Sequence, residues 1–301
     1  MTKSPLKVCA YQQAVTADRD ANLSAAIAAA HEAADAGARL LLLQELFALP
    51  YFCQSIDNAH FELAEPVPGP ATKALGAVAR ARELVIVVPL FEQRPSGVFH
   101  NTAAVIDSDG SLAGLYRKMH IPDDPGYYEK YYFTPGDLGF SPIDTAVGRL
   151  GVLICWDQWF PEAARLMALA GADMLLYPTA IGWHPPDDEG EQQRQREAWI
   201  TVQRAHAIAN ALPVISCNRT GFEADPSGAL PGIEFWGSSF ICGPQGEILA
   251  QAAPGEAAIL VADIDLARAR EIRRQWPFFR DRRVDAYADL VRLGRDQGTS
   301  D

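Results

Sequence analysis

Residues 148–179 read GRLGVLICWDQWFPEAARLMALAGADMLLYPT, a stretch that predicts a strand, a helix and a second strand in succession. Residues 152–154 are large and apolar, as a buried strand requires. A helical pattern begins at Pro161, and a second apolar run follows at 174–177. Units of this kind build α/β sheets, in which reactive groups lie at the carboxyl ends of strands. Cys155 falls at such an end.

Two interpretations of Cys155 are open from this stretch alone. A single cysteine after three apolar residues is most often a small buried side chain. A sharp turn between a strand and a helix also presents a nucleophile well, and nearby backbone N–H groups favour the thiolate. The identity of its partners must decide between a packing role and a catalytic one.

Composition narrows the class of protein. The chain has 301 residues, of which 49% are hydrophobic, and a formal net charge of −12, so a polyanion such as a nucleic acid is an unfavourable partner. Its N-terminal residues lack the apolar segment of a secretory signal, and no apolar run approaches the roughly 20 residues of a membrane span. We therefore expect a soluble, cytoplasmic protein. The five cysteines form neither a disulfide framework nor a CxxC metal pattern: Cys9, Cys53, Cys155, Cys217 and Cys242.

Short apolar strands alternate with helical segments along the whole chain, which predicts mixed sheets covered by helices in a single domain over residues 1–301. The tail from about 276 is a candidate for oligomer contacts. Two long loops, 119–142 and 181–190, are candidates for functional loops. Strands are expected at 6–11, 39–43, 84–91, 101–106, 111–118, 213–217, 238–242, 248–252 and 258–264, and helices at 20–36, 70–83, 191–211, 266–275 and 284–293.

Three polar residues end strand-like runs in the same manner. Glu45 ends RLLLLQE, Lys118 ends SLAGLYRK and Cys155 ends GRLGVLIC. If those strands run side by side, the three side chains emerge at one edge, where a buried charge requires a partner. Taken separately, Glu45 is equally explained as a helix-capping or surface acid, and Lys118 as an ordinary edge lysine.

Together these three residues have the chemical groups that hydrolysis of an amide requires. Glu45 would remove the proton from the Cys155 thiol, which then attacks a carbonyl carbon. Lys118 and the backbone N–H of Trp156 would stabilise the oxyanion. The protonated Glu45 would next give its proton to the leaving nitrogen, and water would repeat the sequence on the thioester.

The motifs LLLLQELF, YRKMHIP and CWDQWFPEAAR around these positions resemble those of the nitrilase, or carbon–nitrogen hydrolase, superfamily, and the resemblance covers essentially the whole chain. It implies a Glu-Lys-Cys triad at Glu45, Lys118 and Cys155, with Glu129 of GYYEKYYFTPG as a second glutamate that supports the lysine or orients substrate. It also implies a four-layer αββα sandwich that dimerises through its helical layers. No metal or organic cofactor is implied.

Within the superfamily, residues 120–140, 155–182 and 278–287 are similar to the branch that hydrolyses N-carbamoylputrescine in polyamine biosynthesis. Such a substrate needs carboxylates for its ammonium and aromatic walls for its methylenes. Each candidate also has an ordinary structural explanation, such as a turn or the first turn of a helix. The candidates for these roles are Asp123, Asp124, Glu191, Trp156 and Trp183.

Two alternatives remain at this stage. One is another amidohydrolase of the superfamily, similar to a β-ureidopropionase or an ω-amidase, whose acidic substrate would need Arg or Lys in the pocket. The segment 121–125 contains two aspartates and no basic residue, which favours an amine. The other is a non-catalytic relative that only binds, against which the joint presence of the four candidate catalytic residues argues.

Overall fold

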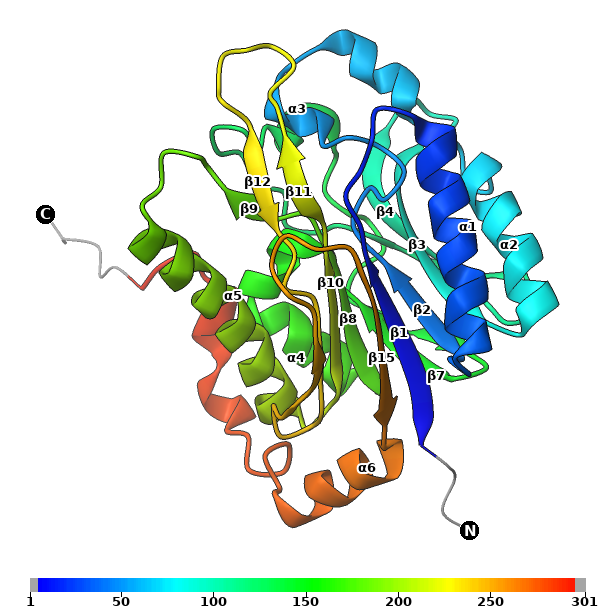
Figure 1. The fold of residues 1–301 in the computed structure, drawn as a ribbon. Helices are drawn as coiled ribbons and strands as arrows, with labels where there is room; N and C mark the ends of the chain where they lie inside the picture. Colours follow the sequence, from blue (N-terminus) through cyan, green and yellow to red (C-terminus); the bar gives the residue numbers. More distant parts are fainter. Residues whose placement is uncertain (1–4, 296–301) are drawn as a thin grey trace, which may run out of the picture.

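The strand β1 (Leu6–Gln12) lies inside the first of two six-stranded mixed sheets in the computed structural model, which describes residues 5–295 (Figure 1). The order in this sheet is β15-β1-β2-β3-β4-β5, in which β1, β2 and β3 are parallel and the other pairs are antiparallel. The bounds of the other strands are β2 (Leu40–Leu43), β3 (Val85–Gln93), β4 (Phe99–Ile106), β5 (Leu112–Arg117) and β15 (Ala258–Ile264).

The second sheet carries the stretch from which the fold was predicted. Its order is β14-β13-β10-β8-β7-β6, with β7, β8 and β10 parallel. Residues 161–169 form the crossover helix that returns the chain from β7 to β8, as predicted. The strands are β6 (Ile143–Thr145), β7 (Gly148–Val152), β8 (Met174–Thr179), β10 (Val214–Asn218), β13 (Phe240–Cys242) and β14 (Ile248–Gln251).

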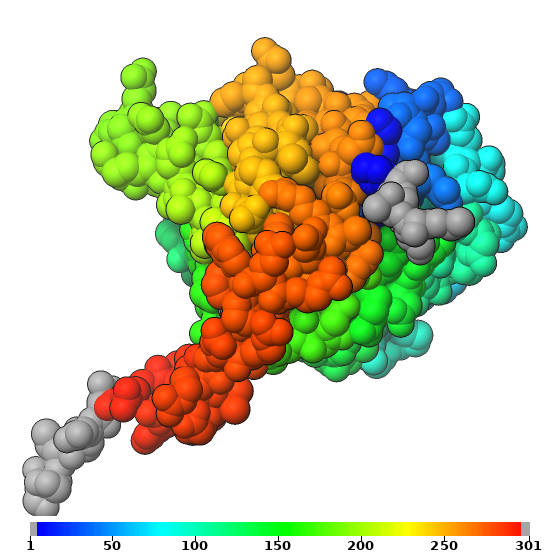
Figure 2. Space-filling view, turned by 90° about the horizontal axis from the view of Figure 1, so that it is seen from below, coloured from blue at the N-terminus to red at the C-terminus, as the bar shows by residue number. Residues whose placement is uncertain are grey.

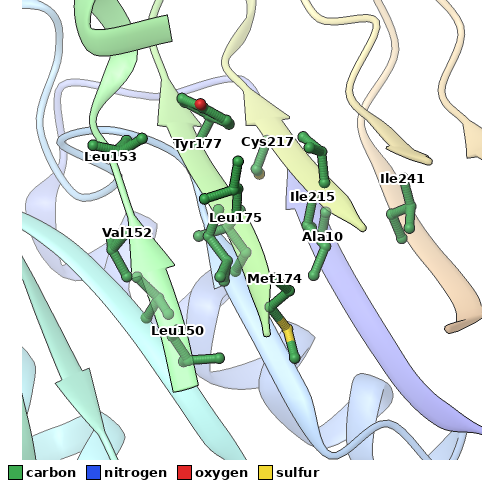
Figure 3. Close-up of a cluster of buried hydrophobic side chains, with 14 of the residues drawn as sticks. Ala10, Leu150, Val152, Leu153, Met174, Leu175, Tyr177, Ile215, Cys217 and Ile241 are labelled. Atoms are coloured by element: carbon green, nitrogen blue, oxygen red, sulfur yellow. The ribbon is translucent and has the colours of Figure 1, made fainter. Parts of the chain in front are cut away.

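The central strands of each sheet are buried on both faces, which explains why they are apolar at nearly every position. In β2, Leu40 and Leu42 point into the core between the two sheets, whereas Leu41 and Leu43 point into a second core beneath the helices. Figure 3 shows part of this buried cluster, in which Ile215 of the second sheet lies beside Ala10 of the first.

Helices cover the outer face of each sheet (Figure 1). The first sheet is covered by α1 (Arg19–Asp35) and α2 (Pro70–Arg82), and the second by α4 (Pro161–Leu169) and α5 (Glu189–Asn210). The Asp18 carboxylate caps α1 by accepting hydrogen bonds from two backbone N–H groups of its first turn. The layers therefore run helix, sheet, sheet, helix, and the prediction of a four-layer αββα sandwich is confirmed.

A small third sheet forms in segments for which the sequence predicted no strand. It consists of β9 (Gly182–Trp183), β12 (Ile233–Trp236) and β11 (Thr220–Glu223), and β9 lies inside the predicted loop 181–190. The predicted loop 119–142 contains a single helical turn, α3 (Glu129–Tyr132). These elements stand above the carboxyl ends of the central strands (Figure 1).

The expected terminal helix at 284–293 is wrong. After α6 (Leu266–Gln275), this segment forms only two short 3₁₀ turns, Val284–Ala286 and Ala288–Val291. Val284, Leu290 and Val291 are 66%, 64% and 92% exposed, so no apolar face is buried that would hold a longer helix together. Figure 2 shows this segment, coloured red, projecting from the body of the protein. Among residues 5–295, none of the helices combines the length and apolarity that crossing a bilayer requires.

Candidate active site

Three strands of the two sheets are followed by polar residues that meet in one buried place. Glu45 lies two residues beyond β2, Lys118 directly follows β5, and Cys155 lies three residues beyond β7. Glu45 and Lys118 are completely buried, and Cys155 is 4% exposed. The two β-sheets thus bring together residues that are up to 110 positions apart in the printed sequence.

The Lys118 ammonium lies between two carboxylates. Its Nζ donates hydrogen bonds to Glu45 Oε1 at 2.8 Å and to Glu129 Oε2 at 2.6 Å. Burial alone would lower the pKa of Lys118, but attraction to Glu129 and Glu45 outweighs it and places this pKa well above its ordinary value. Lys118 is therefore a fixed positive charge in the interior.

Glu129 is the first residue of α3, and its carboxylate is fully enclosed. In addition to Lys118, it accepts a hydrogen bond from the Tyr51 hydroxyl at 2.6 Å. Burial raises the pKa of Glu129 to about 7, helped by the nearby charge of Glu45 and opposed by the attraction of Lys118. Its geometry supports the lysine from the side opposite to Glu45.

Cys155 begins a 3₁₀ turn, Cys155–Trp159, in a left-handed backbone conformation with φ of 45°. A non-glycine residue held there stores roughly 1–3 kcal/mol of strain, a feature that clusters at active sites. Its Sγ lies 3.9 Å from the carbonyl oxygen of Ala180. Burial and the charge of Glu45 raise the pKa of the Cys155 thiol well above its ordinary value, although Lys118 works in the opposite direction. The resting sulfur is a neutral thiol that needs a base before it can attack.

The two oxygens of the Glu45 carboxylate have different surroundings. Oε1 accepts hydrogen bonds from Lys118 and from the Asn101 amide at 2.7 Å. Oε2 is buried and has no hydrogen-bond partner within residues 5–295. Behind the carboxylate, the buried Arg219 guanidinium donates to the backbone carbonyls of Glu45 and Leu46 at 3.1 and 3.0 Å. The peptide that carries Glu45 is thus fixed from one side and its carboxylate from the other.

A second buried carboxylate connects the lysine and cysteine segments. Asp157 Oδ2 accepts hydrogen bonds from the Tyr116 hydroxyl at 2.7 Å and from the Ile154 N–H at 2.9 Å. Its Oδ1 accepts from the His120 backbone N–H at 3.0 Å and lies 2.7 Å from His120 Nδ1. Tyr116 and His120 flank Lys118, whereas Ile154 and Asp157 flank Cys155. One side chain therefore fixes the spacing between the two segments.

A cavity of about 680 Å³ opens onto Cys155 and Glu129. Its wall is aromatic near the sulfur, with Trp156 and Tyr127 among its residues, and a cavity of this size suits a small ligand. Further out it carries three carboxylates and a guanidinium: Asp124, Asp187, Glu191 and Arg194.

Among the substrate-binding residues expected from the sequence, Asp124, Trp156 and Glu191 line this cavity. Asp123 and Trp183 are not among its lining residues; the Trp183 indole N–H instead donates to the Gln192 carbonyl at 3.0 Å.

Several contacts of the site were not anticipated. The central carboxylates and the Glu45 peptide receive donors from other segments of the chain. The Asn101 amide donates to Glu45, the Tyr51 hydroxyl to Glu129 and the Arg219 guanidinium to the Glu45 backbone carbonyl. Asp187 was also missed, although its place in a Pro- and Asp-rich loop was a weak signal. Within residues 5–295, no group of three or more His, Cys, Asp or Glu side chains is placed to hold a metal ion.

This chain is similar in sequence to known carbon–nitrogen hydrolases. The family model described as carbon-nitrogen hydrolase matches residues 7–274. The chain is 46% identical over 288 residues to N-carbamoylputrescine amidase of Solanum lycopersicum, covering 95% of each protein. It is 41% identical over 290 residues to a citrullinase of Francisella tularensis subsp. tularensis, covering 95% of this chain and 98% of the relative.

Solved structures agree with the fold. A crystal structure of a carbon-nitrogen hydrolase from Helicobacter pylori G27 matches with a TM-score of 0.94 and 49% identity, covering 96% of this chain and 99% of that one. A variant of the amidase from Nesterenkonia sp. AN1 matches with a TM-score of 0.69 and 27% identity, covering 91% and 97%. That structure carries the acetamide moiety of fluoroacetamide covalently added at its active site cysteine.

Proposed function

Because this chain belongs to the carbon–nitrogen hydrolase family of the nitrilase superfamily, we propose that it hydrolyses N-carbamoylputrescine to putrescine, ammonia and carbon dioxide. The observation that carries this proposal is the 46% identity to an N-carbamoylputrescine amidase over 95% of both chains. The carboxylates and aromatic side chains of the cavity support it on chemical grounds.

In the proposed first step, Cys155 Sγ forms a bond to the ureido carbon while its proton passes to Glu45 Oε2. A base is required because the resting thiol is neutral, and Oε2 is the carboxylate oxygen without another partner. The carbonyl oxygen becomes an oxyanion, which the Lys118 ammonium and the Trp156 backbone N–H stabilise.

In the second step the carbon–nitrogen bond breaks, and Glu45 returns the proton to the leaving nitrogen. A thiocarbamate ester of Cys155 remains, which still carries the second nitrogen of the ureido group. Water then attacks this ester, again losing a proton to Glu45, and the thiolate leaves and recovers that proton, which releases a carbamic acid. The carbamic acid breaks down to carbon dioxide and the second nitrogen product, so that ammonia, putrescine and carbon dioxide are all formed. The thiol and the carboxylate are both restored at the end of the cycle. Glu129 supports Lys118 throughout, since its Oε2 lies 2.6 Å from Nζ.

For the distant ammonium of the substrate, Asp124 and Asp187 are the best-placed carboxylates. Both line the cavity, and neither side chain has a hydrogen bond or ion pair within residues 5–295. Glu191 is less available, since Arg194 Nη2 lies 2.7 Å from its Oε2 and Gln195 donates to its Oε1 at 3.2 Å. A free buried ammonium needs an uncommitted anion, which these two aspartates supply.

A ureido amino acid such as citrulline is the second candidate substrate. It carries a carboxylate as well as an ammonium, and Arg194 in the cavity lining is the observation that favours it. The 41% identity to a citrullinase points to the same chemistry. Because Arg194 is already paired with Glu191, a carboxylate ligand would have to displace that pair, and the carbamoyl amine remains our first choice.

A substrate panel tests the proposal. The purified protein is assayed for ammonia release and for kcat/KM with N-carbamoylputrescine, citrulline, N-carbamoyl-β-alanine and glutaramate. We expect the highest kcat/KM for N-carbamoylputrescine, by roughly tenfold, which corresponds to a loss of about 1.4 kcal/mol when a substrate lacks the ammonium that pairs with the cavity carboxylates. A higher value for citrulline would replace the proposed substrate with the second candidate, and a preference for glutaramate would contradict both.

A further inference from the structure

The side chain of Asn101 has one polar contact, and it is with the proposed general base. Asn101 lies in β4, is completely buried and pairs with Phe91 of β3. Its amide Nδ2 donates to Glu45 Oε1 at 2.7 Å, while its Oδ1 has no partner within residues 5–295. An amide with a single bond, buried in a strand, does little for packing, since its other polar atom is desolvated without compensation.

The backbone of Asn101 is tied to the same site. Its carbonyl oxygen accepts the Lys118 N–H at 2.9 Å, so the residue contacts both members of the Glu45–Lys118 pair. With Lys118 Nζ and Asn101 Nδ2 both directed at Oε1, rotation of the carboxylate would break two hydrogen bonds to a charged group. The carboxylate is therefore locked with Oε2 as the oxygen that remains without a donor.

We propose that Asn101 is a positioning residue that makes Glu45 Oε2, and not Oε1, the acceptor of the thiol proton. The proposal rests on the proposed hydrolytic function, in which Glu45 is the general base. Asn101 does not line the cavity, so it acts through Glu45 and not on the substrate.

Other ionisable groups share this environment and must be held constant in any test. Each of them interacts electrostatically with Glu45, and none is altered by a substitution at position 101. They are Lys118, Glu129, Cys155, Tyr51, Tyr127 and Cys53.

The test replaces the amide by an apolar side chain of similar volume in the variant Asn101→Leu. Asn101→Ala is the second variant, used if the Leu variant does not fold. Without the donor, the Glu45 carboxylate loses a hydrogen bond to its charged form, so the acid limb of the kcat/KM–pH profile should move to higher pH. We expect kcat at neutral pH to fall roughly 10- to 100-fold, and KM to change by less than about twofold.

Asn22→Leu is the matched control. Asn22 is also a buried asparagine, and its amide donates to the Thr16 and Ala48 carbonyls, on the far side of the first sheet. This control should lower stability without moving the acid limb. If Asn101→Leu lowers kcat but leaves the acid limb where the parent has it, as in Asn22→Leu, the residue is merely structural and the inference is wrong.

A second readout separates this inference from the choice of substrate. Chloroacetamide alkylates Cys155, a reaction that needs the same base but no natural substrate. The extent of alkylation is measured by intact mass as a function of pH, with Cys155→Ala as the blank. The alkylation profile of Asn101→Leu should shift in the same direction as its turnover profile. A parent that alkylates normally but ignores N-carbamoylputrescine would refute the proposed substrate alone, whereas an unshifted alkylation profile would refute the role of Asn101.

Discussion

His120 and Asp157 are joined twice, through the His120 backbone N–H at 3.0 Å and through its Nδ1 at 2.7 Å, both to Asp157 Oδ1. The imidazole is further stacked on Phe160, with ring centroids 3.8 Å apart and planes at 4°. Since His120 follows Lys118 and Asp157 follows Cys155 by two residues each, this pair determines how far apart the ammonium and the sulfur lie.

Replacing Asp157 by Asn should therefore weaken both the fold and the reaction. An amide has one acceptor oxygen in place of two, so at least one of the donors from Tyr116, Ile154 and His120 is left buried without a partner. We expect the free energy of unfolding to fall by about 2–4 kcal/mol, measured by urea denaturation, together with a loss of kcat. Asp144→Asn, at an exposed position of β6, should change stability by less than about 0.5 kcal/mol. Equal stability of parent and Asp157→Asn would exclude this connecting role.

Cys155→Ala should fold normally and show no turnover, because the proposed mechanism has no other nucleophile. Circular dichroism and ammonia release are the measurements, and intact mass of the parent after a thiol-trapping substrate analogue should reveal one covalent adduct. Cys242→Ala is the control, since Cys242 is buried in β13 outside the cavity lining and should leave activity intact. Turnover by the Cys155 variant would remove the thiol from the mechanism.

Glu129 gives the folded protein a measurable dependence on pH. Its pKa rises from 4.5 to about 7 on folding, so the folded state holds this proton more tightly than the unfolded chain. The stabilisation is complete below about pH 4.5 and is lost as pH rises through 7, by about 3 kcal/mol in total.

Glu129→Gln cannot titrate at this position. The free energy of unfolding of the parent minus that of Glu129→Gln should therefore decrease by about 2.5 kcal/mol between pH 5 and 8. Denaturant titrations of both proteins across this range make the comparison. A difference that stays constant with pH would show that this carboxyl has the same proton affinity in the folded and unfolded states.

Asp124→Asn should raise KM for N-carbamoylputrescine roughly 10-fold. It should raise KM for an uncharged carbamoyl analogue by less than about twofold. The same holds for Asp187→Asn if the two carboxylates share the ammonium. Glu191→Gln provides the comparison, because that carboxylate is already neutralised by Arg194 and its loss should affect KM weakly. Equal effects of Asp124→Asn on both substrates would remove Asp124 from ammonium binding.

The strong patterning of the strands was sufficient to predict mixed sheets covered by helices, whereas the four-layer sandwich was implied by the resemblance to the nitrilase superfamily. Runs such as Leu40–Leu43 are apolar at every position, which fits a strand buried on both faces, and the helices start at clear signals such as Pro70 and Pro161. The sheet of β9, β11 and β12 escaped prediction because these strands have only two to four residues each and lie among turn residues.

For the site, the sequence identified the residues at strand ends and their meeting at one edge, but not the further contacts that hold them. Glu45 and Lys118 are 73 residues apart, and Asn101 and Glu45 are 56 apart. No local periodicity encodes such pairs; they follow from the order of β2, β3, β4 and β5 in the sheet. Arg219 is hardest to foresee, because a fully buried guanidinium is rare and here depends on the Glu223 carboxylate and on the backbone carbonyls of Glu45 and Leu46.

The neutral resting state of Cys155 also bears on how long the protein survives in a cell. Peroxide oxidises thiolates far faster than thiols, and many reactive cysteines are lost to sulfinic and sulfonic acids for that reason. Here burial and neighbouring carboxylates keep the sulfur protonated until a bound ligand and Glu45 act together. Because the thiolate forms only when substrate is bound, the free enzyme should react slowly with peroxide. Its activity should therefore persist at peroxide concentrations that inactivate enzymes whose cysteine is a thiolate in the resting state.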